Sequence, residues 1–107
     1  MKFTVLLASL LLCGLAHGQS AHHCAPDAAK QAKKLLGFHY GEEVPMDITK
    51  QVKTMAPLKN PAGKGSFDVL EVTGYIQKAT YRMHFIYGQI PGDCVLVGQE
   101  IIEITNL

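Results

Sequence analysis

The chain has 107 residues, 48% of them hydrophobic, and its ten Lys and Arg stand against nine Asp and Glu, a formal net charge of +1. A chain this close to neutral lacks the concentrated positive field that phosphate binding requires, so we expect no nucleic acid partner. The length suffices for one domain and is too short for two.

The first 18 residues have the composition of an export signal. Lys2 provides a short basic region, residues 3–15 are almost wholly apolar, and Ala16 and Gly18 place small residues where signal peptidase cuts. We therefore predict a signal peptide over 1–18 and a secreted, extracellular domain over 19–107. The apolar run is too short to span a bilayer and no other stretch is apolar enough, so we expect no membrane span.

A helix is predicted over Ala25–Leu36. Pro26 suits its first turn, and Asp27 complements the positive end of the helix dipole. We expect Gly37 to end the helix and residues 38–45 to be irregular. The apolar side of this helix consists of Ala28, Ala29, Ala32, Leu35 and Leu36, and the other side carries Lys30, Lys33 and Lys34.

The middle of the chain carries weaker patterns. Ile48–Met55 is compatible with a strand that has Ile48 and Val52 on one face. Residues 56–66 contain two Pro, two Gly and two Lys, which is typical of a loop.

The last third is rich in strand patterns. Ser66–Ile76 contains many β-branched residues, and Ala79–Tyr87 alternates between two faces. One face carries Ala79, Tyr81, Met83, Phe85 and Tyr87, and the other carries Thr80, Arg82 and His84. Pro91-Gly92 then suits a type II turn.

The final strand, residues 94–105, changes phase along its length. Val95 and Val97 share one parity, and Ile102 and Ile104 share the other. A bulge near Gly98 and Gln99 would turn both pairs toward the core. Together these patterns predict an α+β domain in which one N-terminal helix packs on an antiparallel sheet of three to four strands.

The chain has three cysteines, an odd number. Cys13 lies in the apolar run and would leave with the signal peptide, so Cys24 and Cys94 would be the two thiols of the exported domain. A lone pair in an exported chain most simply forms one disulfide, which here would pin the helix to the sheet. Such a bond would remove both thiols from nucleophilic catalysis.

His22-His23-Cys24 resembles a metal cluster, because imidazole and thiolate are good soft ligands. However, adjacent residues seldom converge on one ion, and no second Cys/His pair lies at zinc-finger spacing, so we predict no metal and no cofactor. His84 is expected to be a solvated sheet residue. The chain has no nucleophile motif and no phosphate-binding glycine loop, and we predict that it is not an enzyme.

An early helix followed by long antiparallel strands resembles the cystatin fold. Residues 76–85, Ile-Gln-Lys-Ala-Thr-Tyr-Arg-Met-His-Phe, are similar to the hairpin where cystatins carry Gln-x-Val-x-Gly and an aromatic-rich strand. Gln77 matches the first motif position, whereas Ala79 stands for Val and the Gly is missing. The chain has no Trp for the Pro-Trp wedge of cystatins, and only Cys94 lies where their second-hairpin disulfide is found.

The resemblance implies a protease inhibitor or protein-binding module whose partner is an extracellular protein, a protease or a receptor. Its contact edge would be the Gln77-Lys78 hairpin together with the Pro91-Gly92 loop. One alternative is a signalling or host-defence factor that acts through the basic helix. Another is a carrier of a small apolar ligand held between helix and sheet by Tyr81, Met83 and Phe85.

Overall fold

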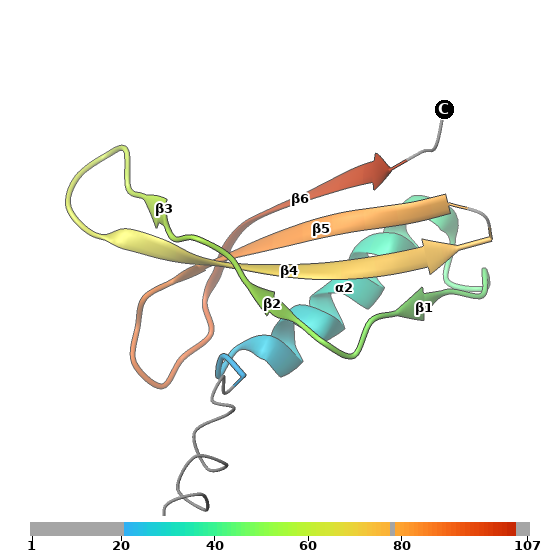
Figure 1. Ribbon diagram of the computed structural model, residues 1–107, viewed down its shortest axis with the longest axis horizontal. Coiled ribbons are helices and arrows are strands. Elements are labelled where there is room, and N and C mark those ends of the chain that lie inside the picture. The colour runs from blue at the N-terminus through green and yellow to red at the C-terminus, as the bar shows by residue number, and fades with distance from the viewer. Residues whose placement is uncertain (1–20, 78, 105–107) are drawn as a thin grey trace, which may run out of the picture.

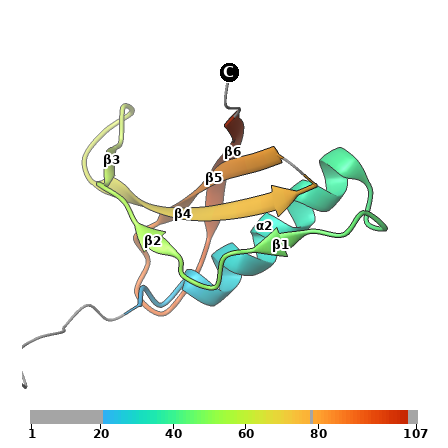
Figure 2. The same ribbon diagram turned by 45° about the vertical axis from the view of Figure 1, so that its right-hand side comes forward.

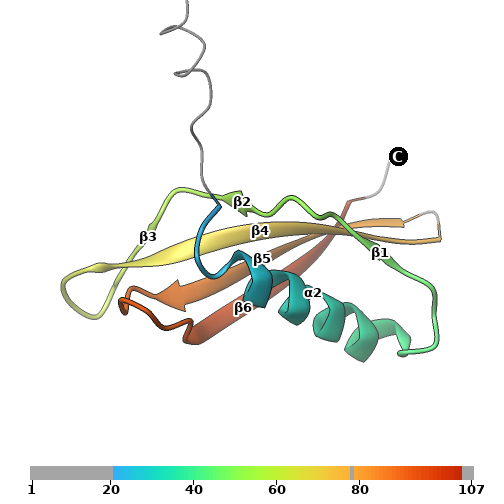
Figure 3. The same cartoon turned by 90° about the horizontal axis from the view of Figure 1, so that it is seen from below.

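A computed structural model describes residues 21–77 and 79–104. The expected signal peptide with Cys13 lies outside these residues, as does Lys78. One helix, α2 (Ala25–Tyr40), lies across one face of an antiparallel sheet (Figures 1 and 3). The strands are β1 (Asp47–Ile48), β2 (Lys53–Thr54), β3 (Leu58–Lys59), β4 (Ser66–Ile76), β5 (Ala79–Gly88) and β6 (Leu96–Ile104). The α+β class is confirmed, and the sheet is larger than predicted.

The sheet is a meander whose first edge is broken into short pieces. Its order is β1-β4-β5-β6, and β2 and β3 also pair with β4, so all three short strands follow one edge of that strand (Figure 2). The expected strand over 48–55 is interrupted because the Thr49 hydroxyl accepts the Thr73 N–H at 3.2 Å, in place of a backbone carbonyl. Leu58 and Lys59, expected in a loop, pair with the start of β4.

The core lies between α2 and the face of β4 and β5 that it covers. The predicted alternation of β5 is confirmed, because Tyr81, Met83, Phe85 and Tyr87 are all buried. These side chains pack with buried residues of β4 and α2: Leu70, Val72, Ile76, Ala28, Ala32, Leu35 and Leu36. The small alanines on this side of the helix allow its backbone to approach the sheet closely.

Gly74 in β4 lies under the helix, where a larger residue would collide with it. A Cβ atom at this position would lie 2.5 Å from Leu36 Cδ1 and 3.1 Å from Met83 Cε. We expect Gly74→Ala to lower the free energy of unfolding by about 1 kcal/mol, measured by urea denaturation, because it overpacks the core. Gly63→Ala is the matched control, since its Cβ would meet nothing within 4 Å. Equal midpoints for the two variants would contradict this account.

The helix ends at Tyr40 and is capped by Gly41, so the prediction that Gly37 ends it is wrong. Gly41 N–H donates to Gly37 O at 2.8 Å, and Gly41 adopts the positive φ of 96° that stops the helix. A glycine inside a helix costs only about 1 kcal/mol relative to alanine. The extra turn brings the Tyr40 ring against Tyr81, with ring centroids 5.1 Å apart. This contact offsets the cost of the internal glycine.

The core face of β6 also differs from the prediction. The bulge lies at Val97, between Leu96, which pairs with Tyr87, and Gly98, which pairs with Ile86. Ile102 pairs with Arg82 and therefore lies on the face opposite the helix. The partly buried residues of β6 that pack on the core are Leu96 and Ile101, and the side chains expected there, Val95, Val97, Ile102 and Ile104, are exposed.

Candidate functional site

Three segments far apart in sequence lie at one end of the sheet. These are residues 21–24 before α2, the turn 60–65 between β3 and β4, and the loop 89–95 between β5 and β6. The turn and the loop lie at the same end of the sheet because Phe67, near the start of β4, pairs with Gly88, at the end of β5. We call these three segments the loop end (Figures 1 and 3).

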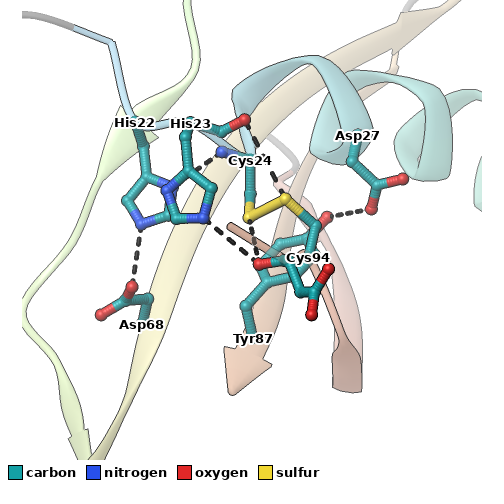
Figure 4. Close-up of a disulfide and its surroundings, with 8 residues drawn as sticks. His22, His23, Cys24, Asp27, Asp68, Tyr87 and Cys94 are labelled. Atoms are coloured by element: carbon teal, nitrogen blue, oxygen red, sulfur yellow. Dashed lines mark hydrogen bonds and ion pairs between the residues drawn. A yellow bond between two sulfur atoms is a disulfide. The ribbon is translucent and has the colours of Figure 1, made fainter. Parts of the chain in front are cut away.

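A disulfide between Cys24 and Cys94 joins the first and third of these segments, as predicted (Figure 4). Their Cα atoms are 5.6 Å apart, and 70 positions separate them in sequence. Cys24 is buried directly before α2, whereas Cys94 is exposed. The bond engages both thiols and is compatible with an extracellular location.

His22 and Asp68 extend this connection to β4. His22 Nδ1 accepts the Cys24 backbone N–H at 3.0 Å, and its Nε2–H donates to Asp68 Oδ2 at 2.8 Å. Asp68 also accepts a hydrogen bond from Gln89 Nε2 at 2.8 Å. The bonds from Gln89 and His22 lower the pKa of Asp68. One carboxylate therefore links the N-terminal segment, β4 and the loop 89–95.

His23 packs against the same group of side chains. Its ring stacks on His22 with centroids 4.7 Å apart, and its Nε2–H donates to the Asp93 carbonyl at 3.2 Å. Figure 4 shows both rings beside the disulfide. The ligand atoms of His22, His23 and Cys24 lie within 4.8 Å of one another. The turn before α2 folds these three adjacent residues onto one side.

A buried tyrosine lies on the other side of the disulfide. Tyr87 is fully buried, and its hydroxyl donates to Asp27 Oδ2 at 2.7 Å. Burial and the bond to Asp27 both raise the pKa of Tyr87. Asp27 thus fixes the first turn of α2 to the end of β5. The disulfide lies close by and fixes the start of the same helix to the loop 89–95.

The loop 89–95 presents apolar side chains to solvent. Ile90 and Val95 are 45% and 43% exposed. The predicted type II turn lies between them, since Gly92 has a φ of 81° and Asp93 N–H donates to Ile90 O at 3.1 Å. Beside it, the N-terminal segment and residues 50–54 border a groove of about 820 Å³ lined by His22, His23 and Val52 among others. The loop end therefore combines a constrained apolar loop with a neighbouring hollow.

The structure does not bring the predicted contact residues together. Gln77 lies in the turn before β5, whereas Pro91 and Gly92 lie in the loop after it. The ten-residue β5 separates them by roughly 30 Å, because each residue of a strand advances about 3.3 Å. Lys78 lies outside the described residues. Consecutive hairpin turns of a meander fall at opposite ends of the sheet, so these two cannot form one edge.

A polar cluster on the face opposite the helix was missed by sequence reasoning. His84 Nε2 lies 2.8 Å from Glu71 Oε2, and His84 Nδ1 lies 2.8 Å from Glu100 Oε1. Burial opposes the charge on His84, but the bonds to both carboxylates outweigh it and raise the pKa of the imidazole. His84 is therefore a largely buried link across β4, β5 and β6, and not a solvated residue. Only the strand register places these three residues in one row.

Two other functions were considered from the sequence, a carrier of a small apolar ligand and a factor that acts through the basic helix, and their residues lie in different surroundings. Tyr81, Met83 and Phe85 pack in the core against α2, at most 4% exposed. Lys30, Lys33 and Lys34 are exposed on α2 and line a hollow of about 410 Å³ with Glu42 and Val44. In the part of the chain that the structure describes, no helix combines the length and apolar character needed to cross a membrane.

Comparison of the chain with protein-family models, curated proteins and solved structures found no match. The geometry of the loop end therefore supplies the argument for function.

Proposed function

We propose that the protein is a secreted, non-enzymatic binding protein that contacts an extracellular protein through its loop end. The observation that carries this proposal is the exposed apolar loop 89–95, which the disulfide holds to the start of α2. Loops on a rigid sheet are common positions for binding residues because they can vary without disturbing the core.

The constraints on this loop favour tight binding. The Cys24–Cys94 bond, the Gln89–Asp68 hydrogen bond and the turn at Pro91-Gly92 each limit its conformations. A loop that is already ordered loses little conformational entropy when it binds. Ile90 and Val95 then provide the apolar contact that is desolvated at the centre of a typical interface.

We propose a protease inhibitor as the first form of this function to test. The loop 89–95 projects from the end of the sheet, and a projecting loop can enter the open groove of a papain-type protease. The partner class is the one that the resemblance to cystatins implies, a protease. The contact edge differs, because it is now the loop end. Pro91 and Gly92 remain in that edge, whereas Gln77 lies at the other end of β5.

Replacing Ile90 by aspartate tests the role of the loop. We expect Ile90→Asp to weaken inhibition of a papain-type protease roughly tenfold or more, because it puts a charge at a desolvated contact. Phe38→Asp is the matched control, because Phe38 is 86% exposed in the last turn of α2, away from the loop end. Residual peptide hydrolysis and thermal unfolding of each variant are the measurements.

Two results would count against the proposal. Absence of inhibition by the unaltered protein at micromolar concentration would remove the inhibitor form. Cross-linking of extracellular proteins to the unaltered chain, Ile90→Asp and Phe38→Asp then tests the wider binding role. A cross-linked partner that survives Ile90→Asp and disappears in Phe38→Asp would place the contact surface at the other end of the molecule.

A further inference from the structure

One long edge of the sheet has no strand beside it. The short strands β1, β2 and β3 cover the outer side of β4, whereas β6 is the last strand at the other side (Figure 1). Within the residues that the structure describes, no strand pairs with the outer side of β6. Every second residue of such an edge strand directs its backbone N–H and C=O away from the sheet, where another strand can pair with them.

The outer side of β6 lacks the features that commonly keep edge strands from pairing. Edge strands are commonly short, bulged, or protected by lysine or proline. The bulge of β6 lies at Val97, and residues 98–104 pair regularly with β5 and include no lysine or proline. The Glu100 carboxylate lies 2.8 Å from His84 Nδ1, so it is directed along the sheet toward β5. Residues 98–104 therefore form a regular edge to which a second strand can be added.

The side chains on the open face of this edge are self-complementary. Ile102 and Ile104 pair with residues of the face opposite the helix and are 46% and 38% exposed. Gly98 lies on the same face and has no side chain, and Ile86 Cδ1 would lie 3.4 Å from a Cβ atom at this position. An isoleucine placed beside Gly98 would therefore continue an apolar row that begins with Ile86.

We propose that two copies of the chain associate through antiparallel pairing of β6 with β6, around a two-fold axis at Ile101. This axis pairs every residue of the regular edge with another residue of that edge. The opposite pairs are Ile101 with itself, Glu100 with Ile102, Gln99 with Glu103, and Gly98 with Ile104. No pair joins like charges, whereas an axis at Glu100 would place two carboxylates opposite each other, which is unfavourable.

This inference goes beyond the proposed binding function and does not depend on it. Residues that lie opposite each other in an antiparallel pair project from the same face, so both helices would cover one face of a continuous sheet. Because the two β6 strands run in opposite directions, the two loop ends would lie at opposite ends of that sheet. The dimer would thus present two separate copies of the proposed contact surface.

The charge at position 102 tests both the association and its register. Sedimentation equilibrium of the unaltered protein should show monomer and dimer with a micromolar Kd. Ile102→Glu places a carboxylate opposite Glu100 of the second copy, and Ile102→Lys places an ammonium group there. We expect dimerisation to be roughly tenfold or more weaker in Ile102→Glu than in Ile102→Lys, and the difference to shrink in high salt. Equal dimerisation of the two variants would overturn the register.

Leu58 provides the matched control. It is 47% exposed, like Ile102, but lies in β3 at the other edge of the sheet. Leu58→Glu and Leu58→Lys should both dimerise as the unaltered protein does. Dissociation caused by Leu58→Glu and not by Ile102→Glu would place the contact at the wrong edge, and an unaltered protein that stays monomeric up to about 1 mM would overturn the association itself.

A crosslink tests the position of the axis. In Ile101→Cys the two introduced thiols would lie opposite each other, with Cα atoms about 4.5–5.5 Å apart, which suits a disulfide. In Gln99→Cys they would lie roughly 13 Å apart along the strands and should not join. After mild oxidation, non-reducing electrophoresis should show a dimer for Ile101→Cys, and peptide mapping should find the Cys24–Cys94 bond intact. Equal dimer bands from the two variants, or none from Ile101→Cys, would overturn the proposal.

Discussion

Replacing both Cys24 and Cys94 by serine is expected to lower the free energy of unfolding by about 4 kcal/mol. The bond closes a loop across 70 sequence positions, and a crosslink of this length removes much of the freedom of the unfolded chain. A small domain buries a limited fraction of its surface, so its core alone gives little stability. The expected loss is therefore a large part of the total free energy of unfolding of this domain.

Urea denaturation of the double variant measures the effect. We expect a lower midpoint and a steeper dependence of the free energy on urea, because the unfolded chain without the crosslink is more expanded. The unaltered protein in a reducing buffer is the matched control and should show the same loss. A loss below about 1 kcal/mol would mean that the bond acts mainly on the folded state.

Stability is expected to fall as pH rises through the pKa of His84. The folded-state pKa of this imidazole is raised above 6.5, so the folded protein binds its proton more tightly than the unfolded chain. The stabilisation is complete below 6.5 and is lost as pH passes the folded-state pKa. When neutral, the ring has one N–H for two carboxylates, so either Glu71 or Glu100 loses its hydrogen bond from His84.

The substitution His84→Gln isolates this effect. We expect it to lower the free energy of unfolding by about 2 kcal/mol below neutral pH and to flatten the pH dependence, since Gln does not titrate. Urea midpoints should be compared above the acidic range in which Asp68, with its lowered pKa, takes up a proton. His39→Gln, an exposed histidine, should keep the original slope. The same slope in His84→Gln would assign the pH dependence to another group.

Arg82 adds a second positive charge to this cluster. Its Nε lies 3.4 Å from Glu71 Oε2, and its side chain is 48% exposed. Solvent screens an interaction of this kind, so the pH dependence is expected to follow His84 and not the constant charge of Arg82.

The elements set by local patterns were predictable. Alternation of apolar residues placed β5 and its buried face, because a strand turns successive side chains to opposite sides. Pro91-Gly92 predicted the type II turn in the loop after β5, because glycine accepts a positive φ. Composition specified the start of α2, but its end depended on a contact between Tyr40 and Tyr81, which are 41 positions apart. The low helix propensity of Gly37 was therefore outweighed by this packing.

The candidate sites depended on pairings that no local pattern encodes. Glu71, His84 and Glu100 form one cluster only in the register of β4, β5 and β6. The same register places Ile102 on the face of the sheet opposite the helix, although the hydrophobicity of this side chain predicted a position in the core. The direction of each strand decided that the loop 89–95 lies beside residues 21–24 and not beside Gln77.

The sequence by itself determined the α+β class, because helix and strand periods follow from backbone geometry and from the burial of apolar side chains. It also predicted that Cys24 and Cys94 pair, because the third cysteine, Cys13, lies in the apolar run of the predicted signal peptide. Only the tertiary structure decided which ends of the strands meet, and therefore that His22 and His23 lie beside the disulfide at an apolar loop. Such neighbours arise from backbone pairing between distant residues, whose register is chosen by the packed core as a whole.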